Sequence, residues 1–163
     1  MANKKITNLT ELTKAASDDY LEIVDTSANA SKKISRENLT GWHFLTTPLT
    51  STSWDGDARS TTAKTKIDLS AVFGVPAGAK GILVRLVARD SGSSTGNCQF
   101  SLSPNAIGNS VAIQAYLQGV PNDVYVSING VVPCDANGDV YYLIVASGTG
   151  TLDAFIEIWG YWL

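Results

Sequence analysis

The sequence predicts an all-β protein, an antiparallel β-sandwich of jelly-roll-like type preceded by a small N-terminal element made of a hairpin and a short helix. Three observations lead to this fold class: low charge, frequent glycine, and short runs in which apolar and polar residues alternate. Of the 163 residues, 44% are hydrophobic, only 17% are charged, and 14 are glycine. A chain of this length can bury a core without help from a metal or a disulfide.

Alternating apolar and polar residues, bounded by turn residues, predict successive strands from residue 66 onward. Within Gly81–Asp90, for example, Ile82, Val84 and Leu86 share one face, which we expect to point into the core. The spacing of these runs, with a turn signal between each pair, is typical of a sandwich or jelly roll. The predicted strands lie within Lys66–Ser70, Gly81–Asp90, Asn97–Ser103, Ser110–Gln118, Asp123–Gly130, Asp135–Val145 and Thr151–Leu163.

The last of these runs carries large apolar groups on both faces. Strict alternation places Leu152, Ile156, Ile158 and Trp162 on one face and Phe155, Trp159 and Tyr161 on the other. An edge strand with a bare apolar face would promote aggregation. Either the strand is central in its sheet with both faces covered, or its outer face packs on another subunit. We favour packing on another subunit.

Residues 1–40 differ from the rest of the chain in charge density. Six of the 12 basic and six of the 15 acidic residues lie there, and the uncharged, Thr- and Ser-rich segment Leu45–Ser53 follows. This change of composition predicts a boundary near residues 40–52. We therefore expect an N-terminal segment at 1–40, a linker at 41–54 and the β-sandwich at 55–163.

The N-terminal segment is predicted to form a hairpin. Tyr20–Asp25 alternates as a strand, turn residues follow, and Lys32–Ser35 can return as the second strand. Ser35 can cap a helical turn over Arg36–Leu39. Because an isolated two-stranded hairpin is only marginally stable in water, its apolar side chains need another surface to cover them. The predicted docking side chains are Ile6, Leu9, Leu12, Tyr20, Leu21, Ile23, Val24, Ile34 and Leu39.

The ordered pattern of this segment carries a family resemblance. Its elements are Ile6, Leu9, Leu12 and Ala15, then Asp18, Asp19 and Leu21–Asp25, then Ser31–Ile34, Asn38 and Leu39. In this order they resemble a short N-terminal segment of bacteriophage tail fibres and other virion appendages. The resemblance implies that the segment attaches the subunit to the particle. Residues 72–96 are more loosely similar to the β-sandwich domains of phage fibre tips and capsid decoration proteins. The chain departs from fibres in having only residues 41–64 where they place a long repetitive shaft.

Neither catalysis nor a cofactor is predicted. His43 is the single histidine, and with Trp42 and Phe44 beside it we expect a packing or linker role, since no second histidine is available for a triad. Asp55 and Asp57 flank a glycine, an arrangement typical of solvated turn residues, whereas a glycosidase pair lies across a cleft. We therefore assign no catalytic, cofactor-binding or metal-binding residue.

The segment Asp135–Asp139 has two interpretations. Its Asp-Ala-Asn-Gly-Asp sequence is similar to the start of a calcium loop, but a twelfth-position glutamate is missing because that position is Ala146. Asn137 and Gly138 form the dipeptide that a type I′ hairpin turn favours. We predict the hairpin turn.

Composition excludes several kinds of partner. A net charge of −3 with scattered basic residues does not suit a nucleic-acid binder, and the longest apolar run, Val140–Ala146, is too short to span a membrane. The first ten residues lack the apolar region of a secretory signal, so we expect synthesis in the bacterial cytoplasm. Cys98 and Cys134 are predicted to be reduced, with a disulfide as the alternative.

Exposed aromatic residues are the remaining candidates for function. They can form a subunit interface, in which aromatic residues are enriched, or they can stack on sugars, and we favour the interface. Trp42 and Tyr125 also belong to this group of aromatic residues, but they are not among the candidates for contact. The candidates are Trp54, Tyr116, Phe155, Trp159, Tyr161 and Trp162.

Taken with the resemblance, these features predict a non-enzymatic protein of the virion surface. The first expectation is a short tail-fibre-like or receptor-binding appendage, a homotrimer that contacts other phage structural proteins and a host polysaccharide. The alternatives are a head decoration protein that stabilises the shell and a carbohydrate-binding module. No nucleic acid and no membrane insertion are expected.

Overall fold

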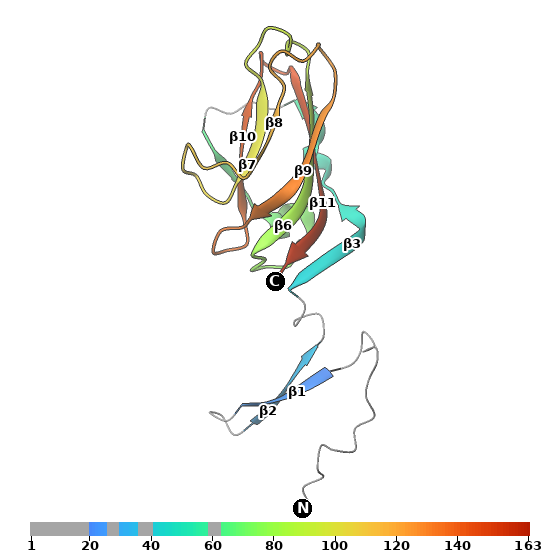
Figure 1. Ribbon diagram of the computed structural model, residues 1–163, viewed down its shortest axis with the longest axis vertical. Helices are drawn as coiled ribbons and strands as arrows, with labels where there is room; N and C mark the ends of the chain where they lie inside the picture. The colour runs from blue at the N-terminus through green and yellow to red at the C-terminus, as the bar shows by residue number, and fades with distance from the viewer. Residues whose placement is uncertain (1–19, 26–29, 36–40, 59–62) are drawn as a thin grey trace, which may run out of the picture. The chain divides into compact units, whose positions relative to one another are not determined.

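The chain divides into two compact units, Met1–Gly41 and Trp42–Leu163. In the first unit β1 (Tyr20–Asp25) and β2 (Ala30–Ser35) form an antiparallel pair in which Leu21 lies opposite Ile34, so the predicted hairpin is confirmed. The computed structural model describes residues 20–25, 30–35, 41–58 and 63–163 (Figure 1). The predicted helical turn at 36–39 and the docking residues Ile6, Leu9, Leu12 and Leu39 lie outside these ranges.

The second unit is built from two antiparallel sheets, which confirms the predicted all-β sandwich. One sheet has the strand order β5-β10-β7-β8, and the other has the order β3-β11-β6-β9 with β4 also paired to β11. The strands are β3 (Trp42–Leu49), β4 (Asp55–Ala58), β5 (Thr65–Ile67), β6 (Gly81–Asp90), β7 (Gln99–Ser103), β8 (Ile113–Tyr116), β9 (Val126–Pro133), β10 (Val140–Val145) and β11 (Leu152–Trp162).

The strand pairing is that of a jelly roll. Apart from β4, the first strand of the unit pairs with the last, β3 with β11, and the second with the second last, β5 with β10. Inward from these, β6 pairs with β9 and β7 pairs with β8. The chain is thus folded back on itself at the β7–β8 connection and rolled into two sheets, which is the double-sheet arrangement of a jelly roll.

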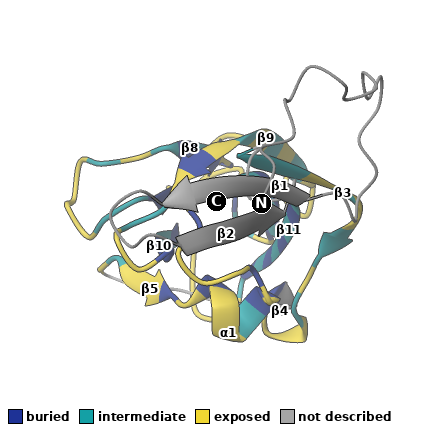
Figure 2. Ribbon diagram, turned by 90° about the horizontal axis from the view of Figure 1, so that it is seen from below, coloured by how far each residue is buried: buried dark blue, intermediate teal, exposed yellow. Residues whose placement is uncertain are grey.

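The core lies between the two sheets and follows from the alternation in each strand. In β6 the predicted inward residues Ile82, Val84 and Leu86 are all buried, and the residues between them are half-buried. They meet residues of the other sheet such as Phe100 and Ile144, which are also fully buried. In Figure 2 buried segments appear on the strands, and α1 shows both exposed and buried residues.

The short helix α1 (Leu69–Phe73) closes one side of the core. Asp68 caps its first turn by accepting a hydrogen bond from the Ala71 N–H, 2.9 Å away. Gly74 ends it in the left-handed region at φ 75°, where a residue without a side chain is favoured. The helix buries Leu69 and Phe73. No helix in the described part of the chain has the length and apolar character that a membrane span requires.

The linker predicted at residues 41–54 is wrong. Its first part is strand β3, which pairs with β11, and its last part is the 3-10 helix Thr52–Trp54, whose Trp54 side chain is buried in the core. Low charge is a property of sheet strands as well as of linkers. The sandwich therefore begins at Trp42.

The hairpin turn predicted at Asn137-Gly138 is also wrong. Of the two residues only Gly138 has a positive φ, 89°, and the strands on either side, β9 and β10, belong to different sheets. The turn is organised instead by the Asp135 carboxylate, which accepts hydrogen bonds from the N–H groups of Asn137 and Asp139 at 2.8 and 2.9 Å. The segment is a connection between the two layers of the sandwich.

Both cysteines are free thiols. Cys98 is fully buried just before β7, and Cys134 is half-buried just after β9. Burial, together with the carboxylates of Asp135 and Asp139, raises the pKa of the Cys134 thiol to about 12. Thiols held protonated in this way are poor nucleophiles, so both cysteines serve packing in this structure.

Candidate functional site

The outer face of the β3-β11-β6-β9 sheet carries an unusual concentration of large apolar side chains at one end. In an ordinary antiparallel sheet with one buried face, the outer face is polar. Here all four strands contribute tryptophan, phenylalanine or aliphatic residues. We call this set the aromatic patch; it consists of Trp42, Phe44, Leu83, Val131, Trp159 and Trp162.

A bulge in β11 brings its two tryptophans to the same face. Ile158 lies opposite Val84, but the next paired residue is Gly160, opposite Leu83, so Trp159 is an extra residue in the strand. One extra residue reverses which face the following side chains occupy. Trp162 therefore joins the outer face instead of the inner one, which corrects the faces predicted by strict alternation.

The same bulge turns Tyr161 toward the core. Tyr161 lies opposite the buried Ile82 and packs against the core cluster. Its ring stacks on that of His43, with centroids 5.1 Å apart and planes 20° from parallel. Tyr161 is thus a half-buried residue on the core side of the sheet, and His43 packs against it.

Gly160 allows β3 to approach β11 at this point. A Cβ at position 160 would lie 2.7 Å from the His43 carbonyl oxygen, far inside van der Waals contact with a backbone atom. Because β3 holds Trp42 and Phe44, this close approach places these two residues of the patch beside β11.

We expect Gly160→Ala to lower the free energy of unfolding by about 1–3 kcal/mol, because the added methyl group must push β3 away from β11. Urea denaturation followed by far-UV circular dichroism measures the change. Gly108→Ala is the matched control, since a Cβ there would meet nothing within 4 Å. Equal stability of the two variants would show that β3 does not need this close approach.

Three of the four aromatic rings of the patch, those of Phe44, Trp42 and Trp162, stand in a row. The Trp42 ring lies 6.2 Å from that of Phe44 and 6.2 Å from that of Trp162, with planes 14° and 20° from parallel. Phe44 is 73% exposed and Trp162 is 43% exposed. The row is therefore held by mutual stacking while much of its surface stays in water.

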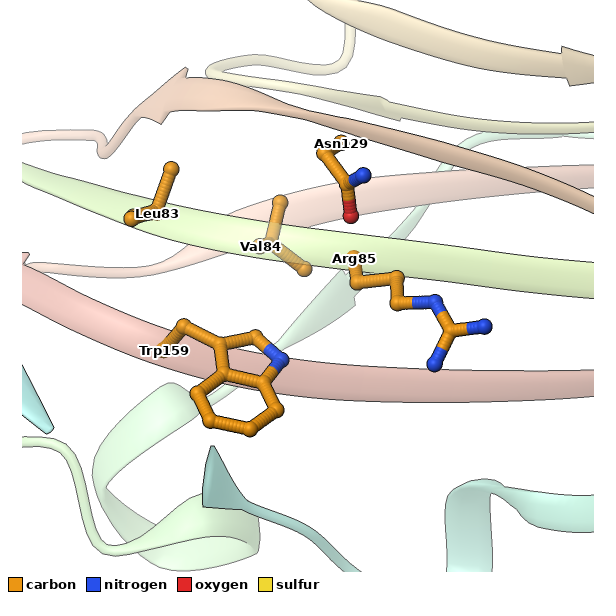
Figure 3. A pocket seen from close by; sticks show the side chains of 5 residues that line it. All are labelled: Leu83, Val84, Arg85, Asn129 and Trp159. Atoms are coloured by element: carbon orange, nitrogen blue, oxygen red, sulfur yellow. The ribbon is translucent and has the colours of Figure 1, made fainter. Parts of the chain in front are cut away.

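Two shallow hollows lie between these side chains. Figure 3 shows the first, of about 330 Å³, where the Trp159 indole of β11 lies beside Leu83, Val84 and Arg85 of β6 and Asn129 of β9. The second, of about 250 Å³, is lined by Trp42, Phe44, Leu83 and Val131. Leu83 lines both, so the two hollows adjoin. The surface that lines them is almost entirely carbon.

Two arginines elsewhere on this face are paired with carboxylates of the same chain. Arg85 contacts Glu157 at 3.1 Å, and Arg89 contacts Asp153 at 2.9 Å. The Arg89 guanidinium also lies 4.9 Å from the centre of the Tyr125 ring, a cation–π contact. The face consequently presents an apolar patch beside two neutralised ion pairs.

The contact residues predicted from the sequence lie in different parts of the structure. Trp159 and Trp162 belong to the patch, and Phe155 lies farther along the same face, half-buried, with its ring 5.9 Å from that of Tyr125. Tyr116 is 52% exposed but stands on β8 of the other sheet, where its hydroxyl donates to Gln118. It does not adjoin the patch.

Trp54 is a core residue, so its assignment as an interface or sugar contact is wrong. It is 5% exposed and stacks on Phe100 with ring centres 5.9 Å apart, and the Tyr142 ring meets it edge-on at 4.7 Å. The two partners come from β7 and β10, so their approach to residue 54 depends on the fold and not on local sequence.

Sequence reasoning missed Phe44, Leu83 and Val131 as members of the site. The available signal was their alternation: Leu83 lies between two inward residues of β6, and Val131 precedes the buried Val132 on β9. Treating residues 41–54 as a linker concealed Phe44. What alternation does not reveal is that these side chains share one end of one sheet.

The patch can bind by burial of apolar surface, and its six side chains supply no acid, base or nucleophile. Among the described residues there is no group of three or more His, Cys, Asp or Glu side chains that could hold a metal ion. The arrangement suits contact with another macromolecule.

Comparison with known proteins adds two distant structural likenesses. No family model and no curated protein matches the chain. A chain of the disulfide-linked pili that form Bacillus endospore appendages is 9% identical, with a TM-score of 0.35, and the match covers 94% of this chain and 99% of that one. The isomalto-dextranase of Arthrobacter globiformis T6 in complex with panose is 14% identical, with a TM-score of 0.33, over 72% of this chain and 21% of the enzyme. At these TM-scores neither likeness indicates a shared function.

Proposed function

We propose that the chain is a non-enzymatic structural protein of a phage particle, a short tail-fibre-like appendage that docks on the virion through residues 1–40. In this proposal the jelly roll projects from the particle and the subunits assemble as a homotrimer. The observation that carries the proposal is the division into two units of different kinds, one with a two-stranded hairpin and one with a complete sandwich core.

The hairpin unit supports a docking role on physical grounds. A pair of six-residue strands has too little apolar surface to be stable alone in water. The jelly roll has its own core of buried residues from both sheets and needs no such support. The proposed docking side chains Tyr20, Leu21, Ile23, Val24 and Ile34 lie on β1 and β2. The resemblance of this segment to virion-attachment segments supports the same role.

The test is incorporation into particles. Full-length chain and a variant lacking residues 1–40 are each supplied with an affinity tag during infection, and purified virions are probed for the tag. We expect the full-length chain in the particle and the truncated chain, folded and soluble, only in the unassembled fraction. Equal incorporation of both would overturn the docking role. A copy number in the hundreds per particle would favour a head decoration protein over a tail appendage.

A further inference from the structure

We propose that a second copy of this chain packs on the outer face of the β3-β11-β6-β9 sheet, with the aromatic patch at the centre of the contact. This contact does not depend on where in a virion the protein lies. The proposed function does not say which surface joins the subunits. The present inference assigns that contact to one face of one sheet.

Exposure of the apolar surface of the patch to water is energetically unfavourable. Phe44, Val131 and Trp162 are 73%, 50% and 43% exposed, and all three lie on one face. Single exposed apolar residues are common on protein surfaces, but a contiguous group of aromatic side chains marks an interaction site. Large aromatic residues are also the residues that contribute most to binding at interface centres.

The chemistry of the hollows favours a protein partner over a sugar. A sugar presents hydroxyl groups, which need hydrogen-bond partners when they leave water. The hollows are lined almost entirely by carbon, and the nearest guanidinium, that of Arg85, is already paired with Glu157. Apolar side chains can fill such hollows without leaving a polar group unpaired.

The face is complementary to itself in charge and in shape. Its basic groups Arg85 and Arg89 are neutralised by Glu157 and Asp153, so two copies can approach without net repulsion. The same face carries both projecting rings and adjoining hollows, which is what a self-complementary contact requires.

The area of the face is also sufficient. Four strands of 8 to 11 residues form it. At about 3.3 Å per residue and about 4.8 Å between strands, this gives a flat area of about 600 Å². A stable contact takes about 800 Å² of accessible surface from each partner, and side chains raise the accessible area of a face above its flat value. Copies related by a two-fold axis meet through the same part of this face, whereas copies around a three-fold axis meet through two different parts of it.

The experiment is analytical ultracentrifugation of the full-length chain at about 1 µM and about 100 µM, a range that brackets micromolar affinity. We expect an oligomer at the higher concentration. The variant Phe44→Glu/Val131→Glu, which buries a charge at the proposed contact, should weaken association about tenfold or more. Val131→Glu alone is a second variant. It should disturb folding less, because it changes one exposed residue on the edge strand β9.

Ile107→Glu/Val111→Glu is the matched control. These two residues are 67% and 46% exposed in the β7–β8 connection, away from the patch, and the substitution adds the same charge. The control should associate like the wild type. A monomeric wild type at the higher concentration, or patch variants that associate as well as the control, would overturn the inference.

The outcome separates this inference from the proposed function. A wild-type monomer that still joins the virion overturns the self-contact and leaves the docking role intact. An oligomer that the patch variants dissociate, but that never joins a virion, supports the self-contact and overturns the proposed function. A dimer supports the self-contact and overturns the homotrimer.

Discussion

Trp54→Ala should lower the free energy of unfolding by about 3–5 kcal/mol, the usual cost of removing a large buried aromatic side chain. The indole is 5% exposed and lies between the two sheets, stacked on Phe100 and met edge-on by Tyr142. Its removal leaves a cavity at a point where three segments distant in sequence meet. Equilibrium unfolding in urea measures the loss.

Two further variants serve as controls for this result. Tyr116→Ala removes an aromatic ring that is 52% exposed, and we expect a loss of about 1 kcal/mol or less. Trp54→Phe keeps a ring against Phe100 and should recover much of the stability lost in Trp54→Ala. If Trp54→Ala costs no more than Tyr116→Ala, the Trp54 ring does not hold the sheets together.

Asp90→Asn should lower the free energy of unfolding by about 3 kcal/mol, because a buried carboxylate that accepts several hydrogen bonds loses its charge. Asp90 is fully buried at the end of β6. Its carboxylate accepts hydrogen bonds from the N–H of Gly92 at 2.7 Å, the N–H of Ser147 at 3.0 Å and the hydroxyl of Thr151 at 3.0 Å, and from the Ser147 hydroxyl. It thereby ties two turns to the sandwich. Asp153→Asn, which breaks a half-exposed ion pair with Arg89, should cost about 1 kcal/mol or less.

The contribution of Asp90 should also depend on pH. Burial is the largest single influence and raises the pKa of Asp90, but the hydrogen bonds from Ser147, Gly92 and Thr151 together outweigh it and hold the pKa below its ordinary value of 3.8. A carboxyl group whose pKa is lower in the folded state stabilises the fold above its ordinary pKa and loses this effect as the pH falls through the folded value.

The difference in stability between wild type and Asp90→Asn is the measurement that isolates this effect. It should be constant from neutral pH down to about pH 4 and shrink below that, because both proteins then carry an uncharged group at position 90. Urea denaturation at a series of pH values gives the two curves. A difference that grows on acidification would show that folding raises the pKa of Asp90 instead of lowering it.

The comparison of β6 with β11 shows where alternation predicts side-chain faces and where it fails. In β6 the inward residues Ile82, Val84 and Leu86 follow from alternation alone and are buried. In β11 the same reasoning placed Trp162 on the face of Ile156 and Ile158, because a bulge at Trp159 is invisible in the spacing of apolar residues. Beside the bulge, Gly160 leaves room for the backbone of β3, a strand more than a hundred residues away.

A turn prediction made from local sequence also failed, because the strands on either side pair with partners far away in the chain. Asn137-Gly138 has the composition of a hairpin turn, but β9 pairs with β6 and β10 pairs with β5 and β7, so no hairpin forms there. By contrast the β1–β2 hairpin was predictable, since both strands and their turn lie within one short stretch of sequence.

The amino-acid order alone thus specifies the strand-forming runs, most of their inward faces, the N-terminal hairpin and the all-β class. These follow from the two-residue repeat of a strand and from turn chemistry, both of which act between near neighbours. Tertiary pairing decides that Trp54 is a core residue and that Trp42, Phe44, Leu83, Val131, Trp159 and Trp162 form one patch. The physical reason is that strands far apart in sequence become neighbours only when the jelly roll closes, and no local pattern encodes which side chains then meet.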